Sequence, residues 1–591
     1  MLFSLLLGCD PAEDSGETPA VGALGLGRMN PFPSVEVIAD GHIDLSGSDL
    51  PLPLDGPTTW DYTPFNLREG FSVAQPSVAM FEQQIDAESI GGPTQIGTDG
   101  SVRMVDLTSG EGIPCFAELD AAENALMTGD RTLIVRPMVA MTPGHEVAVV
   151  VTSAVTSGGS PLTVPEAEGH YADLRESLEA LGFSDITVAW DYPVADGRAL
   201  LDGMLATRTT PTAHSFSETW DSESEDPPVP TVARQAEGSF TVDNWLIDET
   251  HVELDGTGVA VKQGTREAYL WVAIPDSVKD AEPGTVPVLV FGHGIMSEPE
   301  DYLGADDDPN GVIQVANKLG AIVVATKWTG LTQDDRLHAI DVAADFARFH
   351  EIPEMLAQAV NDTESLIDYV ANGDLLADDI FGGLADKSNI IYYGISLGGI
   401  EGAVTLANQD SIERGVLHVG GSAWATMLER SAQWPPFDLI VTREFPDPFE
   451  RQLLYSATQV LWEPVDPAAH VDRMAGRELI WQESVGDEQV PNMTTELLTR
   501  SLGLSVMQPS VNTPFGFGTV AAPTTASVLV QFDPETDMPP EENRPAPLTG
   551  AHSDPRLWPG TQQQIVQFLT TGEVAHYCGD SACSASNPGS W

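Results

Sequence analysis

One serine in this chain lies in a glycine-rich turn of the kind that exposes a nucleophile. The stretch Gly394-Ile395-Ser396-Leu397-Gly398 follows a β-branched and aromatic run, Asn389–Tyr393, and precedes a helix-compatible run, Leu397–Asn408. A tight strand-to-helix turn holds such a serine in a strained backbone conformation and exposes its Oγ, while the flanking glycines let strand and helix approach. The pattern predicts Ser396 as a nucleophile. The alternative, an inert serine in a glycine-rich turn, is disfavoured because other members of a catalytic set lie elsewhere in the chain in a consistent order.

A second glycine-containing turn, Gly292-His293-Gly294-Ile295, ends a buried-strand pattern at Val288–Phe291. In hydrolases that present a serine from a strand-to-helix turn, such a loop donates one backbone N–H to the developing oxyanion, and the residue after the nucleophile donates another. We therefore expect the N–H groups of Ile295 and Leu397 to form an oxyanion hole. The two glycines of the turn are expected to support it, and its histidine is expected to be structural.

An aspartate follows a late strand-like run, where an acid could orient a catalytic base. Asp487 comes shortly after Leu479–Glu483 and is followed by Glu488-Gln489-Val490-Pro491. A carboxylate in this position holds a histidine in the right tautomer and stabilises its cation. The pattern predicts Asp487 as that acid, with Glu483 and Glu488 as the rival acids.

A histidine follows the last strand-like run and precedes the last helix-like run. It lies in Gly550-Ala551-His552-Ser553-Asp554, downstream of Ala526–Phe532. The order nucleophile, acid, base is the one that this kind of fold requires, so we expect His552 to be the general base. His576 is the alternative, but it lies beyond the last helix and beside two cysteines.

Together these residues predict acyl transfer. His552 would take the proton of Ser396, whose Oγ attacks a carbonyl carbon while two backbone N–H groups bind the oxyanion. The set requires no cofactor. A peptidase, a thioesterase and an acyltransferase could use the same residues, since one fold and one triad host many reactions.

The elements that must position these residues are strands alternating with helices after about residue 235, a pattern typical of a mostly parallel sheet covered on both faces. The predicted strands are Ala268–Ile274, Val286–Phe291, Ala321–Ala325, Asn389–Tyr393, Gly415–Val419, Leu479–Glu483 and Ala526–Phe532. The predicted helices lie near Asn310–Leu319, Pro353–Asn372, Leu397–Asn408, Met493–Leu502 and Gly560–Leu569.

Residues about 423–475 interrupt this alternation and predict an inserted cap. Four aromatic residues there indicate either an apolar acyl or aromatic binding site or the packing of the cap itself: Trp424, Trp434, Phe437 and Trp462.

The part before residue 230 is rich in β patterns. Strands are expected at Val35–Ile38, Ser72–Met80, Arg131–Pro137 and Glu146–Thr152, and helices at His170–Leu181 and Gly197–Thr207. The chain has 591 residues, and a single core rarely grows beyond about 300 residues. We therefore expect a β-rich N-terminal domain at 31–230, a catalytic domain at 235–575 and a tail at 576–591.

The catalytic residues resemble those of the α/β-hydrolase superfamily, which implies a doubly wound, mostly parallel sheet with a helical cap. The N-terminal part, Asp40 to about Val155, resembles that of bacterial virulence-factor-type lipases, with Phe65–Ser72 and Met141–Val147 as the similar segments. That resemblance implies a β-rich domain of the immunoglobulin-like sandwich type before a serine esterase or lipase domain, and an ester of a small molecule or a lipid as substrate. A surface binding lipoprotein with an inert hydrolase domain is the alternative from another class.

The chain is strongly acidic, with 26 Lys and Arg against 89 Asp and Glu and a formal net charge of −63. Such a surface repels phosphate backbones, so nucleic-acid binding is not expected. The acidity suits a salty medium, where ions screen self-repulsion. The segment Asp306-Asp307-Asp308-Pro309-Asn310-Gly311 could offer oxygen ligands to a structural calcium ion, although it lacks the spacing of an EF-hand loop. No other metal is expected.

The N-terminal stretch Leu6-Leu7-Gly8-Cys9 resembles a lipoprotein lipobox, with residues 10–30 as an acidic tether. This predicts residues 1–9 as a signal, lipidation at Cys9, export, and either a membrane-anchored or an extracellular protein. The alternative is an apolar N-terminus with a chance cysteine. Cys578 and Cys583 could form a disulfide in an oxidising compartment, whereas Cys115 is expected to be a buried, small apolar side chain.

Overall fold

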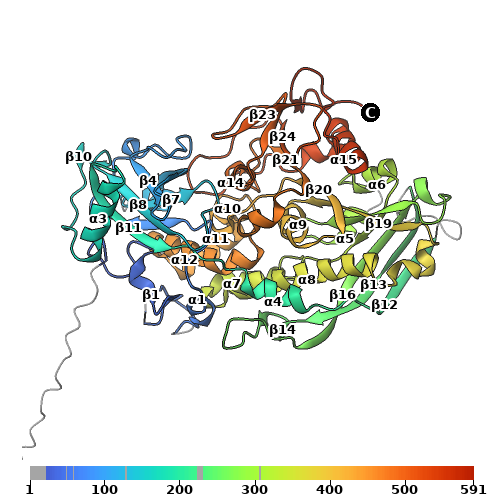
Figure 1. The fold of residues 1–591 in the computed structure, drawn as a ribbon, viewed down its shortest axis with the longest axis horizontal. Helices are drawn as coiled ribbons and strands as arrows, with labels where there is room; N and C mark the ends of the chain where they lie inside the picture. The colour runs from blue at the N-terminus through green and yellow to red at the C-terminus, as the bar shows by residue number, and fades with distance from the viewer. Residues whose placement is uncertain (1–21, 48–49, 57–58, 127–128, 222–230, 305–307) are drawn as a thin grey trace, which may run out of the picture.

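A twelve-stranded sheet forms the centre of the C-terminal part of the chain (Figure 1). The structure, a computed structural model, describes residues 22–591 except 48–49, 57–58, 127–128, 222–230 and 305–307. The strand order is β12-β13-β16-β18-β17-β19-β20-β21-β24-β22-β23, with β25 added beside β24. The strands are β12 His214–Asp221, β13 Val232–Asn244, β16 Gly264–Pro275, β17 Val286–Gly292, β18 Ile322–Ala325, β19 Ala385–Ile395, β20 Ile412–His418, β21 Glu478–Ser484, β22 Ser505–Gln508, β23 Gly518–Ala521, β24 Val528–Asp533 and β25 Cys583–Ser584.

The sheet is antiparallel at one end and parallel elsewhere. Strands β12, β13 and β16 pair antiparallel, and β16 also pairs antiparallel with β18. From β18 to β24 every neighbouring pair is parallel. Each predicted strand of this part is present, which confirms the large, mostly parallel sheet. Strand β12 lies within the range 31–230 that the sequence assigns to the N-terminal domain, yet it pairs with β13 in the large sheet.

Both faces of the sheet are covered, because successive side chains of a strand point to opposite faces. In β17, Val288 and Val290 belong to one apolar cluster, and Leu289 and Phe291 belong to the other. The first cluster includes side chains of α8 and α9, and the second includes side chains of α6 and α15. The bounds of these helices are α6 Val312–Leu319, α8 Glu351–Ala371, α9 Leu397–Asn408 and α15 Pro559–Thr571. The sheet is therefore doubly wound, as the sequence predicted.

Besides two two-stranded sheets, the described N-terminal part holds two larger antiparallel sheets. The first has the order β11-β8-β4-β5 and the second β3-β7-β6. Their bounds are β3 Ser77–Met80, β4 Val102–Asp106, β5 Gly112–Ile113, β6 Cys115–Leu119, β7 Thr132–Pro137, β8 Glu146–Thr152 and β11 Ile186–Pro193. The two predicted helices are α3 His170–Ala180 and α4 Ala199–Thr207.

The strand predicted at Val35–Ile38 is wrong. Val35–Val37 form a 3-10 helix, η1, and only Ile38 continues into the two-residue strand β1, Ile38–Ala39. The side chain of Val37 is buried at 1% exposure. The apolar pattern of this segment reflects burial in the tertiary structure. A run of β-branched residues looks the same in the sequence whether its side chains are buried in a helical turn or in a strand.

Helices connect β20 to β21 where the sequence predicted a cap. They are α10 Trp424–Leu428, α11 Pro435–Glu444, α12 Pro448–Trp462, η7 Glu463–Val465, η8 Pro467–His470 and α13 Val471–Met474. In Figure 1 the cap helices α10, α11 and α12 lie between the N-terminal sheets and the large sheet. The N-terminal sheets and the cap share one apolar core, which contains Val135 of β7 and Leu453 of α12.

A buried charge network links the N-terminal sheets to the cap. Arg136 of β7 forms ion pairs with Glu118 of β6, at 2.6 Å, and with Glu429 just after α10. Arg430 pairs with the other oxygen of Glu118. Burial alone would raise the pKa of Glu118, but the neighbouring Arg430 and Arg136 hold it below its usual range. Because a buried charge is costly without its partner, this network holds the cap against the N-terminal sheets.

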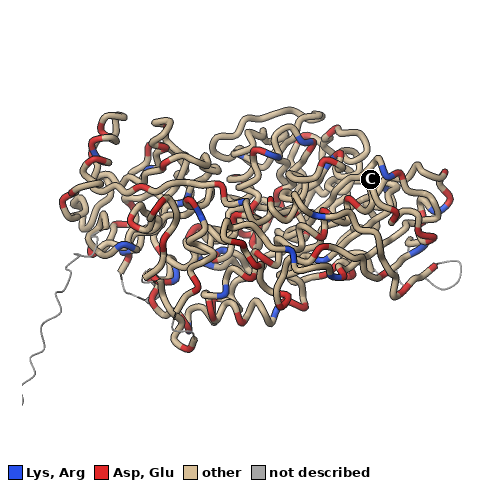
Figure 2. The backbone as a smooth tube through the Cα atoms, turned by 60° about the horizontal axis from the view of Figure 1, so that its bottom comes forward, with Lys and Arg blue, Asp and Glu red and all other residues tan. Residues whose placement is uncertain are grey.

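The acidic residues are spread over the molecule. Figure 2 shows Asp and Glu along most of the chain, in both the N-terminal part and the large-sheet part, with fewer Lys and Arg between them. The excess charge is therefore a property of the whole surface and not of one acidic face.

Replacing Arg136 with leucine is expected to destabilise the junction between the N-terminal sheets and the cap. Removing one partner of a buried ion pair costs about 3–5 kcal/mol, because the carboxylate of Glu429 stays buried without its cation and Glu118 keeps only Arg430. The measurement is urea unfolding followed by tryptophan fluorescence. The matched control is Arg544→Leu, since the Arg544–Glu542 pair is exposed and an exposed pair contributes under about 1 kcal/mol. Equal midpoints for the two variants would contradict the structural role of the network.

Candidate active site

Ser396 occupies a strained turn between β19 and α9. Its backbone angles are φ 58° and ψ −117°, a region that residues other than glycine rarely adopt. Its N–H donates to the carbonyl of His418 in β20, at 2.9 Å. The serine thus stands at the carboxyl end of a central strand, where the sequence placed it.

The flanking glycines allow three backbones to meet beside this serine. A Cβ on Gly394 would lie 1.9 Å from the carbonyl oxygen of Gly398, and a Cβ on Gly398 would lie 2.1 Å from the carbonyl oxygen of Gly292. No real side chain tolerates such distances. Larger residues at these positions would push α9 away from the ends of β17 and β19.

The loop after β17 lies beside the nucleophile. A Cβ on Gly294 would lie 3.6 Å from the Cβ of Ser396, and the N–H of Gly294 donates to the hydroxyl of Tyr302 at 3.2 Å. Ile295 and Leu397 both line the pocket that contains Ser396. Leu397 is the first residue of α9, where an N–H has no acceptor within the helix and the helix dipole favours negative charge. The structure thus brings the two predicted oxyanion-hole residues together around the serine.

His293 fixes this loop and does not act as a base. Its Nε2 accepts from the N–H of Trp328 at 2.9 Å, so its Nδ1 carries the proton and donates to the carbonyl of Gly294 at 2.8 Å. Burial lowers the pKa of His293 to about 4. The ring is therefore neutral at ordinary pH and holds the loop from two sides.

The acid and the base lie on the loops that follow β21 and β24. The carboxylate of Asp487 contacts Nδ1 of His552 with both oxygens, at 2.9 and 2.8 Å, and the two side chains are only 2% and 3% exposed. Asp487 also accepts from the N–H groups of Gln489 and Val490 at 2.8 and 2.9 Å. This pair fixes the histidine tautomer and leaves Nε2 as the atom that can take a proton.

The rival residues have other roles in the structure. Glu488 accepts from the backbone N–H groups of His552, at 3.1 Å, and Gly550, at 3.2 Å, so it positions the loop that carries the base. Glu483 is buried in β21 and accepts from Gln531 at 3.0 Å, and burial raises its pKa well above the usual value. His576 contacts the carbonyl of Ser581 at 2.8 Å, beside the C-terminal cysteines.

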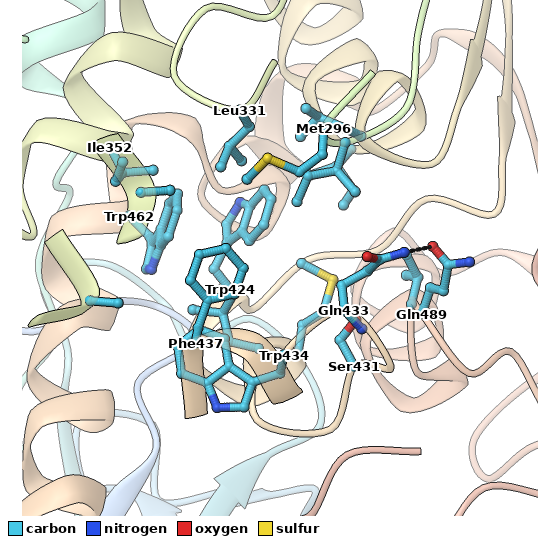
Figure 3. Close-up of a pocket in the computed structure, with 18 of the residues that line it drawn as sticks. Met296, Leu331, Ile352, Trp424, Ser431, Gln433, Trp434, Phe437, Trp462 and Gln489 are labelled. Carbon is cyan, nitrogen blue, oxygen red and sulfur yellow. Dashed lines mark hydrogen bonds between the residues drawn. The ribbon is translucent and has the colours of Figure 1, made fainter. Parts of the chain in front are cut away.

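An apolar pocket of about 100 Å³ opens beside Ser396 (Figure 3). The indoles of Trp424 and Trp462 stack at 4.5 Å in its wall. A hydrogen bond of 2.8 Å joins the side chains of Gln433 and Gln489 (Figure 3). Gln433 belongs to the cap and Gln489 to the loop that carries Asp487, so this bond connects the two. The pocket would accept an alkyl or aromatic group next to the nucleophile.

All four aromatic residues that the sequence singled out in the cap line this pocket, which favours the binding-site interpretation over cap packing alone. Residues before and within α8 form the opposite wall: Leu331, Phe346, Phe349 and Ile352. The sequence did not indicate these residues, because segment 331–352 lies outside the predicted strands and cap. The one sequence feature that could have pointed to this wall is the share of apolar and aromatic side chains in that segment.

The C-terminal tail contains a disulfide between Cys578 and Cys583, with a Cα–Cα distance of 5.1 Å. The thiol of Cys115 is buried and free, and burial raises its pKa to about 12. Within the described part of the chain, the one close group of three metal-ligating residue types is His576 with these two disulfide cysteines. Because disulfide sulfurs are not thiolate ligands, this group is not a zinc site.

Two predictions from the sequence fall partly or wholly on residues outside those the structure describes. The first is lipidation of Cys9, which stays a prediction. The second is the calcium loop, of which Asp306 and Asp307 lie outside the described residues. The neighbouring Asp308 accepts from two N–H groups at the start of α6, at 3.2 and 2.7 Å. Among the described residues, no helix combines the length and apolar character needed to cross a membrane.

No family model and no curated protein sequence matches this chain. Among solved structures, acetyl xylan esterase 1 from a Thermoanaerobacterium species is 14% identical, with a TM-score of 0.36 over 64% of this chain and 93% of that chain. Acylaminoacyl peptidase from Pyrococcus horikoshii is 16% identical, with a TM-score of 0.28 over 50% of this chain and 42% of that chain. At these scores the likeness carries no argument of its own, so the fold assignment rests on strand order and on the serine turn.

Asp487→Asn is expected to lower the rate at which an active-serine phosphonate labels Ser396 by about 10²–10⁴-fold, because the asparagine no longer holds His552 in the proton-accepting tautomer. The rate is measured by intact-protein mass spectrometry over time. Glu483→Gln is the matched control: it replaces a nearby buried carboxyl that accepts a hydrogen bond from Gln531, and labelling should be unchanged. Similar losses in both variants would contradict the assignment of Asp487.

Proposed function

We propose that this protein is a serine hydrolase that cleaves carboxylic esters through an acyl-enzyme on Ser396. The observation that carries the proposal is the buried pair of Asp487 and His552, held at the same sheet edge that presents Ser396 in a strained turn. A buried histidine oriented by a carboxylate, with a serine and backbone N–H groups at the same edge of the sheet, is the arrangement that acyl transfer needs.

The proposed reaction assigns one step to each of these residues. Nε2 of His552 accepts the proton of Ser396 as its Oγ attacks the ester carbonyl carbon. The N–H groups of Ile295 and Leu397 bind the resulting oxyanion, and Asp487 stabilises the imidazolium. The carbon–oxygen bond to the alcohol then breaks, and the leaving alkoxide takes the proton from His552.

Water completes the cycle. His552 removes a proton from a water molecule, whose oxygen attacks the acyl carbon, and the released Oγ of Ser396 regains that proton. The product is the free acid.

An ester or lipid-ester substrate is favoured over a peptide by the pocket. Its wall beside Ser396 is apolar and aromatic, with Gln433 and Gln489 bonded to each other. Burial of alkyl groups supplies the binding energy of such a site, whereas a peptide backbone would leave polar groups without partners. Thioesters and acyl transfer to an alcohol other than water are the second candidates, since the same apolar pocket would accept their acyl groups.

The proposal also covers the location of the enzyme and the type of its N-terminal domain. Export, with lipidation of Cys9 and attachment to a membrane, is supported by the lipobox-like sequence and fits the disulfide of the tail, which needs an oxidising compartment. The two antiparallel N-terminal sheets fit a sandwich-type domain as in virulence-factor-type lipases. An acidic surface keeps such a protein soluble and repels nucleic acids.

Ser396→Ala is expected to lower kcat for p-nitrophenyl esters by about 10⁴–10⁶-fold, since a triad acts as a unit. Both proteins are assayed from the acetate to the palmitate in salty buffer. Ser431→Ala is the matched control, because Ser431 is a second buried serine that lines the same pocket. It should keep most of the activity.

Two results would sink the proposal. One is ester hydrolysis that persists undiminished in Ser396→Ala. The other is a folded parent protein that neither hydrolyses any ester nor reacts with a phosphonate, which would favour a surface binding protein with an inert hydrolase domain.

A further inference from the structure

One side chain lines both the pocket beside Ser396 and a second, larger cavity. The pocket has a volume of about 100 Å³, and the second cavity, between the N-terminal sheets and the cap, has about 770 Å³. Within the described part of the chain, Trp434 is the one residue that lines both. It lies immediately before α11 and is buried at 6% exposure.

Two aromatic rings hold Trp434 in this wall, one from each side. Phe437, which lines the pocket, stacks on the indole at 5.7 Å. Tyr455, which lines the second cavity, meets it edge-on at 5.8 Å. The indole is thus clamped between the two spaces, and its position is fixed by packing. Figure 3 shows Trp434 and Phe437 next to each other in the pocket wall.

The two spaces differ in chemistry. The pocket is lined almost wholly by apolar side chains, whereas carboxylates of the cap and the N-terminal sheets line the second cavity, among them Asp120, Glu429 and Asp438. An alkyl chain gains most free energy from burial in the first space, and less in the second, where apolar side chains such as Ile90 and Leu119 alternate with polar ones. The indole therefore ends the apolar site and shields it from the carboxylates beyond.

The volume of the pocket sets the size of the group it can bury. A water-sized group needs at least about 10–15 Å³ of such volume and occupies about 30 Å³ in a liquid, so 100 Å³ holds on the order of three to ten such groups. A methylene is about the size of a water molecule. The space suits a short or medium-length alkyl chain and is too small for a long fatty acyl chain.

We propose that Trp434 is the residue that sets acyl specificity, and that the substrates are esters of apolar acids of short to medium chain length, about four to ten carbons. The proposal rests on the proposed function, because it takes Ser396 as the nucleophile that receives the acyl group. The acyl chain extends from Ser396 into the apolar pocket and stops at the indole.

This arrangement predicts a peaked dependence on chain length. Each methylene that is buried raises kcat/KM about fourfold. We expect kcat/KM of the parent to climb from p-nitrophenyl acetate to about the octanoate and to fall for the palmitate, whose chain meets the wall.

The test is to open the wall. Trp434→Ala joins the pocket to the second cavity, so the ratio of kcat/KM for palmitate to that for octanoate should rise about tenfold or more, while kcat/KM for acetate changes about threefold or less. All esters are dispersed in the same detergent. Met427→Ala is the matched control, because Met427 lines the pocket and not the second cavity. It enlarges the pocket without opening the wall and should leave palmitate a poor substrate.

The proposal would be overturned if Trp434→Ala had the same dependence of kcat/KM on chain length as the parent. It would also be overturned if the substitution changed kcat/KM only among esters that share one acyl group and differ in the alcohol. Trp434→Phe, which keeps a ring in the wall, should behave as the parent does.

A second measurement uses the parent protein alone, so it does not depend on the folding of a variant. Labelling of Ser396 by p-nitrophenyl octylphosphonate should exceed labelling by the hexadecyl analogue about tenfold or more. Equal rates would overturn the role of Trp434 and keep Ser396 as nucleophile. If neither reagent labels Ser396, the proposed function itself fails.

Discussion

The site depends on one steric constraint, the close approach of three backbones around Ser396. The serine keeps a positive φ only because Gly394 and Gly398 leave no side chains between the ends of β17 and β19 and the start of α9. That same approach aims the first N–H groups of α9 at the space above the serine and places the loop of Ile295 beside it. A strained backbone conformation persists when the surrounding structure fixes it. Here the pairing of Gly292 in β17 with Gly394 in β19 fixes the backbone next to Ser396.

The cap and the N-terminal sheets form the second half of the site. The acid and base stand on the large sheet, but the apolar walls come from α10 to α12 and from α8. The cap in turn is fixed to the N-terminal sheets by the buried pairs of Arg136 with Glu118 and Glu429. The N-terminal part therefore contributes to the substrate pocket without supplying a lining residue, since it holds the helices that do.

Local sequence signals predicted the elements of the large sheet and the residues that do chemistry. The turn at Ser396, the acid after β21 and the histidine after β24 each have a short-range pattern, and the fold fixes their order. The pairing of Glu488 with the backbone of His552, the edge strand β12 and the wall at Phe346 could not be predicted. They arise from long-range packing: Arg136 and Glu429 are 293 positions apart, and no periodicity in the sequence records such a contact.

The central claim is that an acyl group passes through Ser396. The most direct measurement is to quench the protein with acid during turnover of p-nitrophenyl octanoate and to map the modified peptide by mass spectrometry. The account predicts an added octanoyl group on the peptide that contains Ser396, and none on the same peptide of Ser396→Ala. Turnover with the octanoyl group on another residue, or with no covalent adduct in single-turnover conditions, would contradict it.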